Sequence, residues 1–439
     1  MLKLCLALPI FYPTFGGGPL RILRSQAGLR KRDVHARVLT GTPRSKDDFH
    51  SLPGDEPRAA EGPIGSMLPI DSVDGIPVHR VQLPSDTGVH RTSTYFRALL
   101  ALCEDPATRP DVVQLHSFER VESLYWLWRL RRLRIPIVHA IQIARPVRRS
   151  SSAGRFAERR FRRAYYDGFD AVLTNSEAIR STLRDWAVRS PIEVVPNGVD
   201  FARYRSFEDE GVRSKARKHL GIRGSGPVVL GVGAICPRKG SDLLVEAWKQ
   251  LLDQHPETEL LLVGPRHDQN NPNLEAFGQR LRDAIANSPR PDRVHLAGVR
   301  DDMNEVYAAA DIVVLASARE GMPNSVIEAM ACRRPVLLTP FLGQSTHLGR
   351  PGIEYLQSDR SATALAGHLA ALLEKPALRE ELVLNGRQWV ERHLDLESNL
   401  DHLAEFYRWA ANRRAMPSRV HALPVPRPAS DSKRPGGEV

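Results

Sequence analysis

Short apolar runs alternate along the chain with longer stretches in which apolar residues recur every three or four positions. A short apolar run predicts a buried strand, whereas the longer periodicity predicts an amphipathic helix. Strands and helices that alternate in this way are typical of βαβ units, which build parallel sheets. We therefore expect an α/β protein.

Turn signals mark the connections in the first half of the chain. The glycine run Gly16-Gly17-Gly18 separates the first apolar run from a helical stretch at residues 20–31, and Asp74-Gly75 is a hairpin-type turn. Residues 44–73 are rich in proline, glycine and charge, and predict a long mobile loop. Strands are expected at residues 2–10, 36–40, 112–115, 135–141, 171–174 and 192–195.

The second half repeats the pattern after a charged stretch at residues 208–218. We expect an N-terminal Rossmann-like domain at residues 1–205 and a C-terminal one at residues 206–397, followed by an amphipathic helix at residues 398–413. Residues 414–439, dominated by proline, arginine and serine, predict a disordered tail. Strands are expected at residues 228–232, 259–263, 294–296, 312–315 and 335–338, with helices between them such as residues 242–253.

Composition narrows the class of protein. The chain has 439 residues, 42% of them hydrophobic, and a formal net charge of +11, which favours an acidic or phosphorylated partner. No apolar run reaches the roughly 18–20 residues of a spanning helix, and we interpret the apolar start, Met1 to Ile10, as a buried strand rather than a signal peptide. The four cysteines form no C-x-x-C pair: Cys5, Cys103, Cys236 and Cys332. We therefore expect neither a metal site nor a disulfide framework, and we expect the protein to lie in the reducing cytoplasm.

The segment from Glu320 to Glu328 carries the most specific chemistry. It follows the predicted strand at residues 312–315, and Asn324 and Ser325 begin a predicted helix. Glu320 would lie on a loop at the carboxyl end of a parallel strand, where such sheets bind ligands. Free backbone N–H groups at the helix start suit a diphosphate, and the flanking carboxylates suit hydroxyls. The segment therefore predicts a nucleotide-sugar site.

A structural interpretation of the same residues stays open. Ser325-x-x-Glu328 also fits a capping box, in which Glu328 would only close the start of the helix. Glu320 could equally be a solvated loop residue. On the pair of carboxylates alone, the two interpretations are evenly balanced.

A second phosphate-binding signal follows the predicted strand at residues 228–232. Residues 233–240 form a glycine-bearing turn that contains Arg238 and Lys239, and Ser241 then opens a helix. Such a turn can cradle a phosphate, and Lys239 supplies a positive charge. The alternative is an ordinary surface turn with two exposed cations.

Together these segments resemble the retaining glycosyltransferases of the GT-B fold, the large Glu-x7-Glu family (glycosyltransferase family 4-like, group 1). The resemblance implies a GT-B-like fold: two facing Rossmann-like domains with a cleft between them, and a last helix that crosses back to the N-terminal domain. The family's motifs occur in order over roughly the first 410 residues: Tyr12-Pro13 with Gly16-Gly17, the predicted strand before Asn175-Ser176, Pro196-Asn197-Gly198-Val199-Asp200, Lys239-Gly240, and Glu320 with Glu328.

The resemblance also implies an activity. The chain would move a hexose from a nucleoside diphosphate sugar to an acceptor hydroxyl, with retention of anomeric configuration and with no metal or other cofactor, in the synthesis of a glycan, polysaccharide or glycolipid. Glu320 would contact the hydroxyls of the donor sugar, and Glu328 those of the ribose. Lys239, with Arg238, would neutralise the diphosphate, and the backbone at Gly16-Gly17 would approach it from the N-terminal domain.

Three positions depart from the family pattern. Ala234 replaces an arginine that pairs with the diphosphate, and Arg238 is the nearest substitute. Gln142 replaces a histidine that points at the sugar; Gln142 can donate a hydrogen bond to a sugar hydroxyl but cannot titrate. His116 is a spare candidate that can equally be structural. Arg333 replaces a glycine where a small residue or a tight bend is expected.

These departures keep other functions open. One alternative is a non-catalytic protein of the same fold that binds a sugar nucleotide or a glycan. Another is a nucleotide-sugar epimerase, which the order of the motifs fits less well. A nucleic-acid binder is not expected, because the sequence has no recognisable reading motif.

A basic segment lies in the half that holds the acceptor in the related family. From Arg145 to Arg163 the chain has eight arginines and one acid, Glu158, with Phe156 and Phe161 among them. The segment predicts peripheral contact with an anionic membrane at its inner face, which would suit a lipid-linked acceptor, or contact with an acidic or phosphorylated acceptor. A solvated helix face is the third interpretation.

Overall fold

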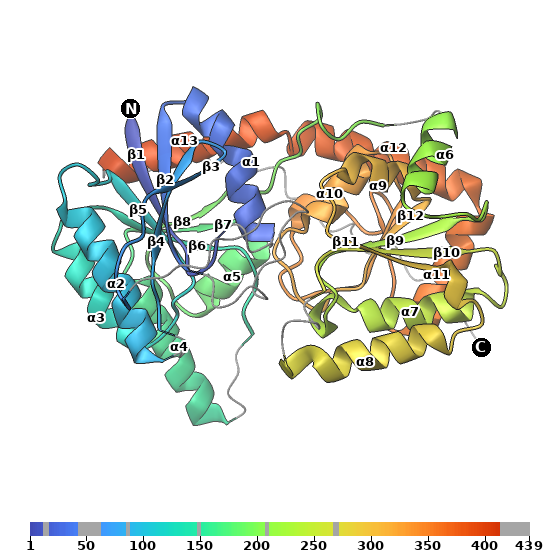
Figure 1. Cartoon of the computed structure of the whole chain (residues 1–439), viewed down its shortest axis with the longest axis horizontal. Helices are drawn as coiled ribbons and strands as arrows, with labels where there is room; N and C mark the ends of the chain where they lie inside the picture. Colours follow the sequence, from blue (N-terminus) through green and yellow to red (C-terminus); the bar gives the residue numbers. More distant parts are fainter. Residues whose placement is uncertain are drawn as a thin grey trace, which may run out of the picture.

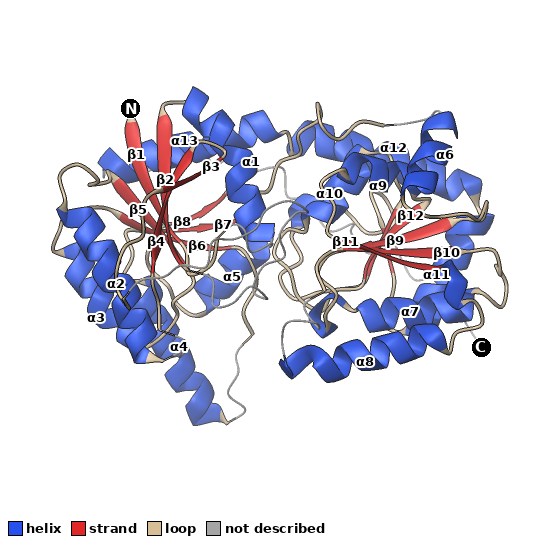
Figure 2. Ribbon diagram, viewed as in Figure 1, coloured by secondary structure: helices blue, strands red, loops and turns tan. Residues whose placement is uncertain are grey.

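The computed structural model describes residues 1–11, 17–42, 63–84, 88–146, 151–206, 210–266 and 272–412. It contains two separate, almost entirely parallel sheets, each with helices packed on both faces (Figures 1 and 2). The predicted α/β class with two Rossmann-like halves is confirmed.

The first half is built on an eight-stranded sheet in the order β3-β4-β2-β1-β5-β6-β7-β8. Its strands are β1 (Leu2–Ala7), β2 (Val34–Gly41), β3 (Asp71–Val73), β4 (Ile76–Val81), β5 (Val112–His116), β6 (Ile137–Ile141), β7 (Ala171–Thr174) and β8 (Ile192–Val194). Its helices are α1 (Gly17–Lys31), α2 (Val89–Glu104), α3 (Glu122–Arg131), α4 (Ser152–Tyr166) and α5 (Glu177–Asp185).

The predicted loop at residues 44–73 is partly corrected. Within its described part, β3 pairs antiparallel with β4 around the Asp74-Gly75 turn. Asp74 has a φ of 50° and Gly75 a φ of 72°, as a tight hairpin of this type requires. The turn prediction is confirmed, but the sequence analysis missed both strands of the hairpin. The three residues of β3 are largely exposed and give no apolar run, and the apolar residues of β4 are interrupted by Pro77, His79 and Arg80.

The second half has a six-stranded sheet in the order β11-β10-β9-β12-β13-β14. Its strands are β9 (Val228–Val232), β10 (Glu259–Val263), β11 (Val294–Gly298), β12 (Ile312–Leu315), β13 (Val336–Leu338) and β14 (Leu356–Gln357). Its helices are α6 (Glu210–His219), α7 (Ser241–Leu251), α8 (Pro272–Ala286), α9 (Met303–Ala309), α10 (Asn324–Ala331), α11 (Ala362–Glu374) and α12 (Pro376–His393), with 3₁₀ turns η2 (Pro237–Lys239), η3 (Pro291–Arg293) and η4 (Thr346–Leu348).

The strand order reverses beside the first strand of each sheet. In the sheet of the first half β1 lies between β2 and β5, and in the second sheet β9 lies between β10 and β12. Connections that leave such neighbouring strands turn to opposite faces, and the crevice between them is where open α/β sheets bind ligands. The carboxyl edges of the two sheets meet, because Ile143 after β6 forms an antiparallel bridge with Gly321 after β12.

The last two helices run along one edge of the molecule, α12 over the second half and α13 (Leu396–Asn412) over the first (Figure 1). Leu400, Ala404 and Tyr407 of α13 join the core formed by α1 and the first sheet. Arg32, directly after α1, pairs with Asp401 at 2.6 Å. The amphipathic face of α13 therefore ties the end of the described chain to the first half.

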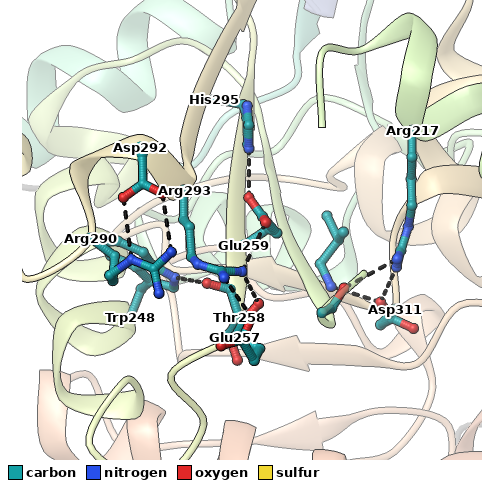
Figure 3. A network of polar contacts seen from close by, with 12 residues as sticks. Arg217, Trp248, Glu257, Thr258, Glu259, Arg290, Asp292, Arg293, His295 and Asp311 are labelled. Carbon is teal, nitrogen blue, oxygen red and sulfur yellow. Dashed lines mark hydrogen bonds and ion pairs between the residues drawn. The ribbon is translucent and has the colours of Figure 1, made fainter. Parts of the chain in front are cut away.

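A polar network closes the amino end of the second sheet (Figure 3). Glu259, at the start of β10, accepts hydrogen bonds from Arg293 Nη1 at 3.0 Å and pairs with His295 Nε2 at 2.7 Å. Asp311 accepts from Arg217 at 2.7 Å and from the N–H of Val228 at 2.7 Å. A buried carboxylate is costly without such partners. The network lies at the edge opposite the ligand crevice, so we interpret it as structural.

Two features bear on the predicted environment of the protein. All four cysteines are buried free thiols. Across the described ranges, no helix has both the length and the apolar character that crossing a membrane requires. The cytoplasmic location stays a prediction.

Candidate active site

Glu320 is a buried, charged group on the loop after β12. Its Oε1 accepts a hydrogen bond from Arg238 Nη1 at 2.7 Å and lies 2.8 Å from Lys239 Nζ. Burial by itself would raise the pKa of Glu320, but the two cations outweigh burial and hold the pKa below its usual value. The alternative of a solvated loop residue is wrong.

The turn after β9 packs directly on this loop. Gly240 has a φ of 69°, and a Cβ there would lie 2.3 Å from the carbonyl oxygen of Ala316, so only glycine fits. The N–H of Ala318 donates to the carbonyl of Arg238 at 2.8 Å. Arg238 and Lys239 are thus held at the β9/β12 crevice and point toward Glu320, which contradicts the surface-turn alternative.

Glu328 is also buried, with 8% of its side chain exposed. Its Oε1 accepts from Arg24 Nη1 at 2.7 Å, and its Oε2 accepts from the Tyr307 hydroxyl at 2.8 Å. Arg24 belongs to α1, so this ion pair crosses from the first half to the second. The capping-box alternative is wrong, because both oxygens of Glu328 are engaged elsewhere and the residue before α10 is Pro323.

Asn197 fixes the start of α10. Its Nδ2 donates to Asn324 Oδ1 at 2.7 Å and to the carbonyl of Met322 at 2.8 Å. Ser325 is the second residue of the helix, and its carbonyl oxygen lies 3.3 Å from the Tyr307 hydroxyl oxygen. Asn197, from the first half, therefore holds the amino end of α10, and the role of Asn324 and Ser325 in binding a diphosphate stays a prediction.

Gln142 lies where the two halves touch. A Cβ on Gly321 would come within 2.1 Å of the Gln142 carbonyl oxygen, so these backbones are in close contact. The N–H of Ala144 donates to the carbonyl of Glu320 at 3.2 Å. The structure therefore places Gln142 beside Glu320. Gly17 begins α1, whereas Gly16 lies outside the described residues.

His116 is a fixed neutral imidazole at the β1/β5 crevice. The Tyr407 hydroxyl donates to Gln114 Oε1 at 2.8 Å, so the amide nitrogen of Gln114 faces His116 Nε2 at 2.7 Å and donates to it. That assignment leaves the His116 proton on Nδ1. Burial, with a smaller contribution from Arg21, lowers the pKa of His116 to about 3. This arrangement fits the structural interpretation of His116.

Arg333 has a simple backbone explanation. It has a φ of 54° and follows the end of α10, where the N–H of Arg334 donates to the carbonyl of Ala329 at 2.9 Å. A left-handed residue commonly ends a helix, and glycine suits it best. Arginine there costs roughly 1–2 kcal/mol, at the far end of α10 from the carboxylates.

The basic segment has an inward and an outward face. Arg162 of α4 is buried, pairs with Glu158 at 2.7 Å and lies 4.4 Å from the centre of the Trp186 ring. Phe156, in contrast, is 68% exposed, and Arg159 and Arg160 are exposed beside it. Arg148 and Arg149 lie outside the described residues. The interpretation of the basic segment as a single solvated helix face therefore describes only its outward side.

Arg24 and Tyr307 were missed by the sequence analysis. Each lies on a helix outside the family motifs, and only the fold brings them to Glu328. The position of Arg24, two turns after the glycine run, is the one signal that could have pointed to it.

Comparisons with known proteins show the family of this chain. Residues 16–198 match the model of a glycosyl transferase 4-like domain, and residues 226–375 match that of the glycosyl transferases group 1. D-inositol 3-phosphate glycosyltransferase of Nocardia farcinica is 31% identical over 378 residues, which is 82% of this chain and 77% of that protein. The chain belongs to the group 1 glycosyltransferases.

Other members of this glycosyltransferase family match over less of their length. D-inositol 3-phosphate glycosyltransferase of Segniliparus rotundus is 28% identical over 309 residues, and the match spans 66% of each protein. For the next three curated relatives the chain spans 59–65% of their length.

The fold is shared with a solved structure. The crystal structure of Anabaena HepE in complex with UDP-glucose superposes with a TM-score of 0.70 at 18% identity, covering 93% of this chain and 100% of that one. At this identity the likeness establishes the GT-B fold.

Proposed function

We propose that this glycosyltransferase moves a hexose from a nucleoside diphosphate sugar to an acceptor hydroxyl, with retention of anomeric configuration. One observation carries the proposal: two buried carboxylates lie on the segment that contains the start of α10, Glu320 before the helix and Glu328 within it. Two cations, Arg238 and Lys239, lie beside Glu320 at the β9/β12 crevice. The UDP-glucose bound in the HepE crystal structure supports the same class of donor.

The cations explain how the leaving group is stabilised. As the bond between the anomeric carbon and the diphosphate oxygen breaks, negative charge grows on the diphosphate. Lys239, Arg238 and the amino end of α10 stabilise that charge, so no metal ion or other cofactor is needed. When the cations turn to the diphosphate, Glu320 is released and accepts hydrogen bonds from the sugar hydroxyls.

The acceptor hydroxyl completes the exchange. Its oxygen bonds to the anomeric carbon on the face that the diphosphate leaves, and its proton passes to the departing diphosphate oxygen. Gln142 donates a hydrogen bond to a sugar hydroxyl and orients the ring, but it carries no proton in this step. Closure of the two halves excludes water and limits hydrolysis of the donor.

The first test is a thermal-shift screen with UDP, GDP, ADP, dTDP and their common sugars. A ligand at about 100 times its Kd stabilises the folded state by about 2.7 kcal/mol. We expect one nucleotide to stabilise the wild type and to lose that effect in Glu328→Ala. Gly367→Ala is a matched control, because Gly367 is distant in sequence from the site residues and a Cβ added there meets no other atom within 4 Å. No stabilisation by any nucleotide would refute the donor assignment, and binding without transfer would favour the non-catalytic alternative.

Retention and metal independence need a transfer assay. With the donor identified by the screen, proton NMR of the first product gives the anomeric configuration, which we expect to match that of the donor. EDTA should leave the rate unchanged. An inverted product, or a rate that EDTA abolishes and Mg²⁺ restores, would contradict these two points separately.

We also propose that the outward face of the basic segment contacts an anionic membrane at its inner, cytoplasmic face. Arg159 and Arg160 lie beside the exposed Phe156, and α4 projects from the first half (Figure 1). Each basic residue near an anionic surface contributes about 1 kcal/mol. Flotation with anionic liposomes should be salt-sensitive and weakened in Arg159→Ala with Arg160→Ala; binding that ignores both salt and the substitutions would refute the contact.

A further inference from the structure

A large cavity opens in the first half beside the proposed donor site. It has a volume of about 1380 Å³ and lies at the carboxyl ends of β1, β2, β5 and β6, with α4 as one wall. A cavity of this size at such an edge has room for a complete small-molecule ligand. Its described wall includes Phe11, Thr42, Phe118, Arg145 and Phe161.

The cavity is continuous with the donor loop. Arg319, directly before Glu320, lines it, and so do Ile143 and Ala144. The backbone of Ala144 is bonded to the carbonyl of Glu320 at 3.2 Å. A molecule in the cavity would therefore lie next to the sugar that Glu320 is proposed to hold.

The wall is basic. Its described residues include five arginines but only two acids, Glu119 and Glu158, with no lysine or aspartate. Glu158 forms an ion pair with Arg162 at 2.7 Å, and Glu119 accepts a hydrogen bond from the Tyr166 hydroxyl. Arg120 is also paired, with Glu122 outside the wall. An excess of positive charge in a concave wall favours an anionic ligand.

Arg145 is the best placed of these cations. It follows β6, three residues after Gln142, and 35% of its side chain is exposed. Its Nη1 lies 3.3 Å from Glu119 Oε2, a loose pair compared with a normal charge-assisted hydrogen bond. A guanidinium has five N–H donors in a planar fork, which suits two oxygens of a phosphate. Ser151 and Gly154 bring the amino end of α4, with its positive dipole, to the same wall.

The rest of the wall is apolar. Phe11, Phe118 and Phe161 face the cavity, and its rim includes Val121, which is 70% exposed. Aromatic faces of this kind pack on sugar rings or hydrocarbon. The ligand therefore combines an anionic group with an apolar face or chain.

We propose that this cavity holds the acceptor by a phosphate group bound to Arg145, with the receiving hydroxyl directed toward Glu320. The word acceptor rests on the proposed transferase function; the phosphate site itself does not. The phosphate can belong to a soluble sugar phosphate or to a lipid headgroup, and both present the same oxygens to Arg145.

The test measures binding to the full chain without donor, so it is independent of catalysis. The probes are glucose 6-phosphate, with glucose as the uncharged control, and phosphatidylcholine vesicles with or without phosphatidic acid. We expect Arg145→Ala to weaken phosphate-dependent binding by roughly 10- to 100-fold, as loss of a charge-assisted hydrogen bond implies. Arg189→Ala, an exposed arginine of the same half outside the cavity wall, should leave it unchanged.

The binding results distinguish a soluble sugar phosphate from a lipid headgroup as the source of the phosphate. Arg145-dependent binding of glucose 6-phosphate, and not of glucose, supports the proposal with a soluble acceptor. Arg145-dependent binding of the phosphatidic acid vesicles alone supports it with a lipid acceptor. Phosphate binding that is absent, or equal in Arg145→Ala and wild type, overturns it. Arg145→Gln replaces the alanine variant if that variant does not fold.

Failure of the proposed function looks different. If the protein is not a glycosyltransferase, no nucleotide should stabilise it in the thermal-shift screen, whereas phosphate should still bind at Arg145. A nucleotide that still stabilises Arg145→Ala, together with unchanged phosphate binding in that variant, would overturn only the acceptor site.

Discussion

The ion pair between Arg24 and Glu328 should compete with the donor nucleotide. Arg24 Nη1 lies 2.7 Å from Glu328 Oε1, and the two side chains are 27% and 8% exposed. If Glu328 binds the ribose hydroxyls, as the resemblance implies, Arg24 must first release that oxygen. Tyr307 holds the other oxygen and does not need to move. The predicted perturbation is Arg24→Ala, which removes the competitor and leaves Glu328 in place.

The magnitude follows from the burial of the pair. A hydrogen bond to a charged group contributes roughly 1.5–3 kcal/mol to stability. This pair is largely buried, so solvent does not reduce its interaction energy to that of an exposed surface ion pair. The wild type loses that energy when the nucleotide binds, whereas the variant does not. We therefore expect nucleoside diphosphate to bind Arg24→Ala about 10- to 100-fold more tightly. The free variant should be less stable, because a buried carboxylate has lost a partner.

The assay is isothermal titration of the nucleotide found in the thermal-shift screen. Arg32→Ala is the matched control: Arg32 directly follows the helix that carries Arg24 and pairs with Glu397 and Asp401 of α13, but it does not contact Glu328. Its nucleotide affinity should stay within about twofold of wild type. The double variant Arg24→Ala with Glu328→Gln should gain nothing over Glu328→Gln alone. Weaker binding in Arg24→Ala would refute the reasoning and make Arg24 part of the nucleotide site.

Two further predictions use other parts of the structure. In Gly321→Ala the new Cβ would lie 2.1 Å from the Gln142 carbonyl oxygen, so the contact between the halves must open and kcat should fall at least about 10-fold. The control Gly367→Ala, whose new Cβ meets open space, should leave kcat unchanged. A kcat for Gly321→Ala equal to that of the wild type would show that catalysis does not need this contact. Burial lowers the pKa of His347 to about 4, so the folded state takes up this proton less readily than the unfolded state. Stability from this residue is complete above about pH 6.5 and should fall by roughly 2–3 kcal/mol toward pH 4, as denaturant unfolding would show; an identical pH slope in His347→Asn would contradict it.

Much of the fold could be predicted from short-range pattern. Strands β7, β9, β10 and β12 have the predicted bounds, because each is dominated by a short run of buried apolar residues. Three strands escaped prediction: β3 is largely exposed, β14 has only two residues, and β4, although it is mostly buried inside the sheet, contains no continuous apolar run. Their pairing depends on a neighbouring strand rather than on their own sequence.

The candidate site was partly predictable for a similar reason. Lys239 and Glu320 lie at strand–helix junctions and Glu328 lies in the helix that follows, and the sequence pattern locates those junctions. The sequence could not show that Glu320 rests on Arg238 and Lys239, because the two loops are adjacent only when β9 and β12 pair. The sequence analysis expected a small residue or a tight bend at Arg333, but only the structure shows that Arg333 adopts a positive φ at the end of α10.

By itself, the sequence determined the α/β class, the two halves, the carboxylate pair and its likeness to a nucleotide-sugar site, because each is written in residues close together in the chain. Only the tertiary structure decided the cross-half contact of Arg24 with Glu328, the bridge from Ile143 to Gly321, and the basic cavity around Arg145. These features join residues from distant parts of the chain. No local pattern encodes them, because they arise from how the two sheets face one another.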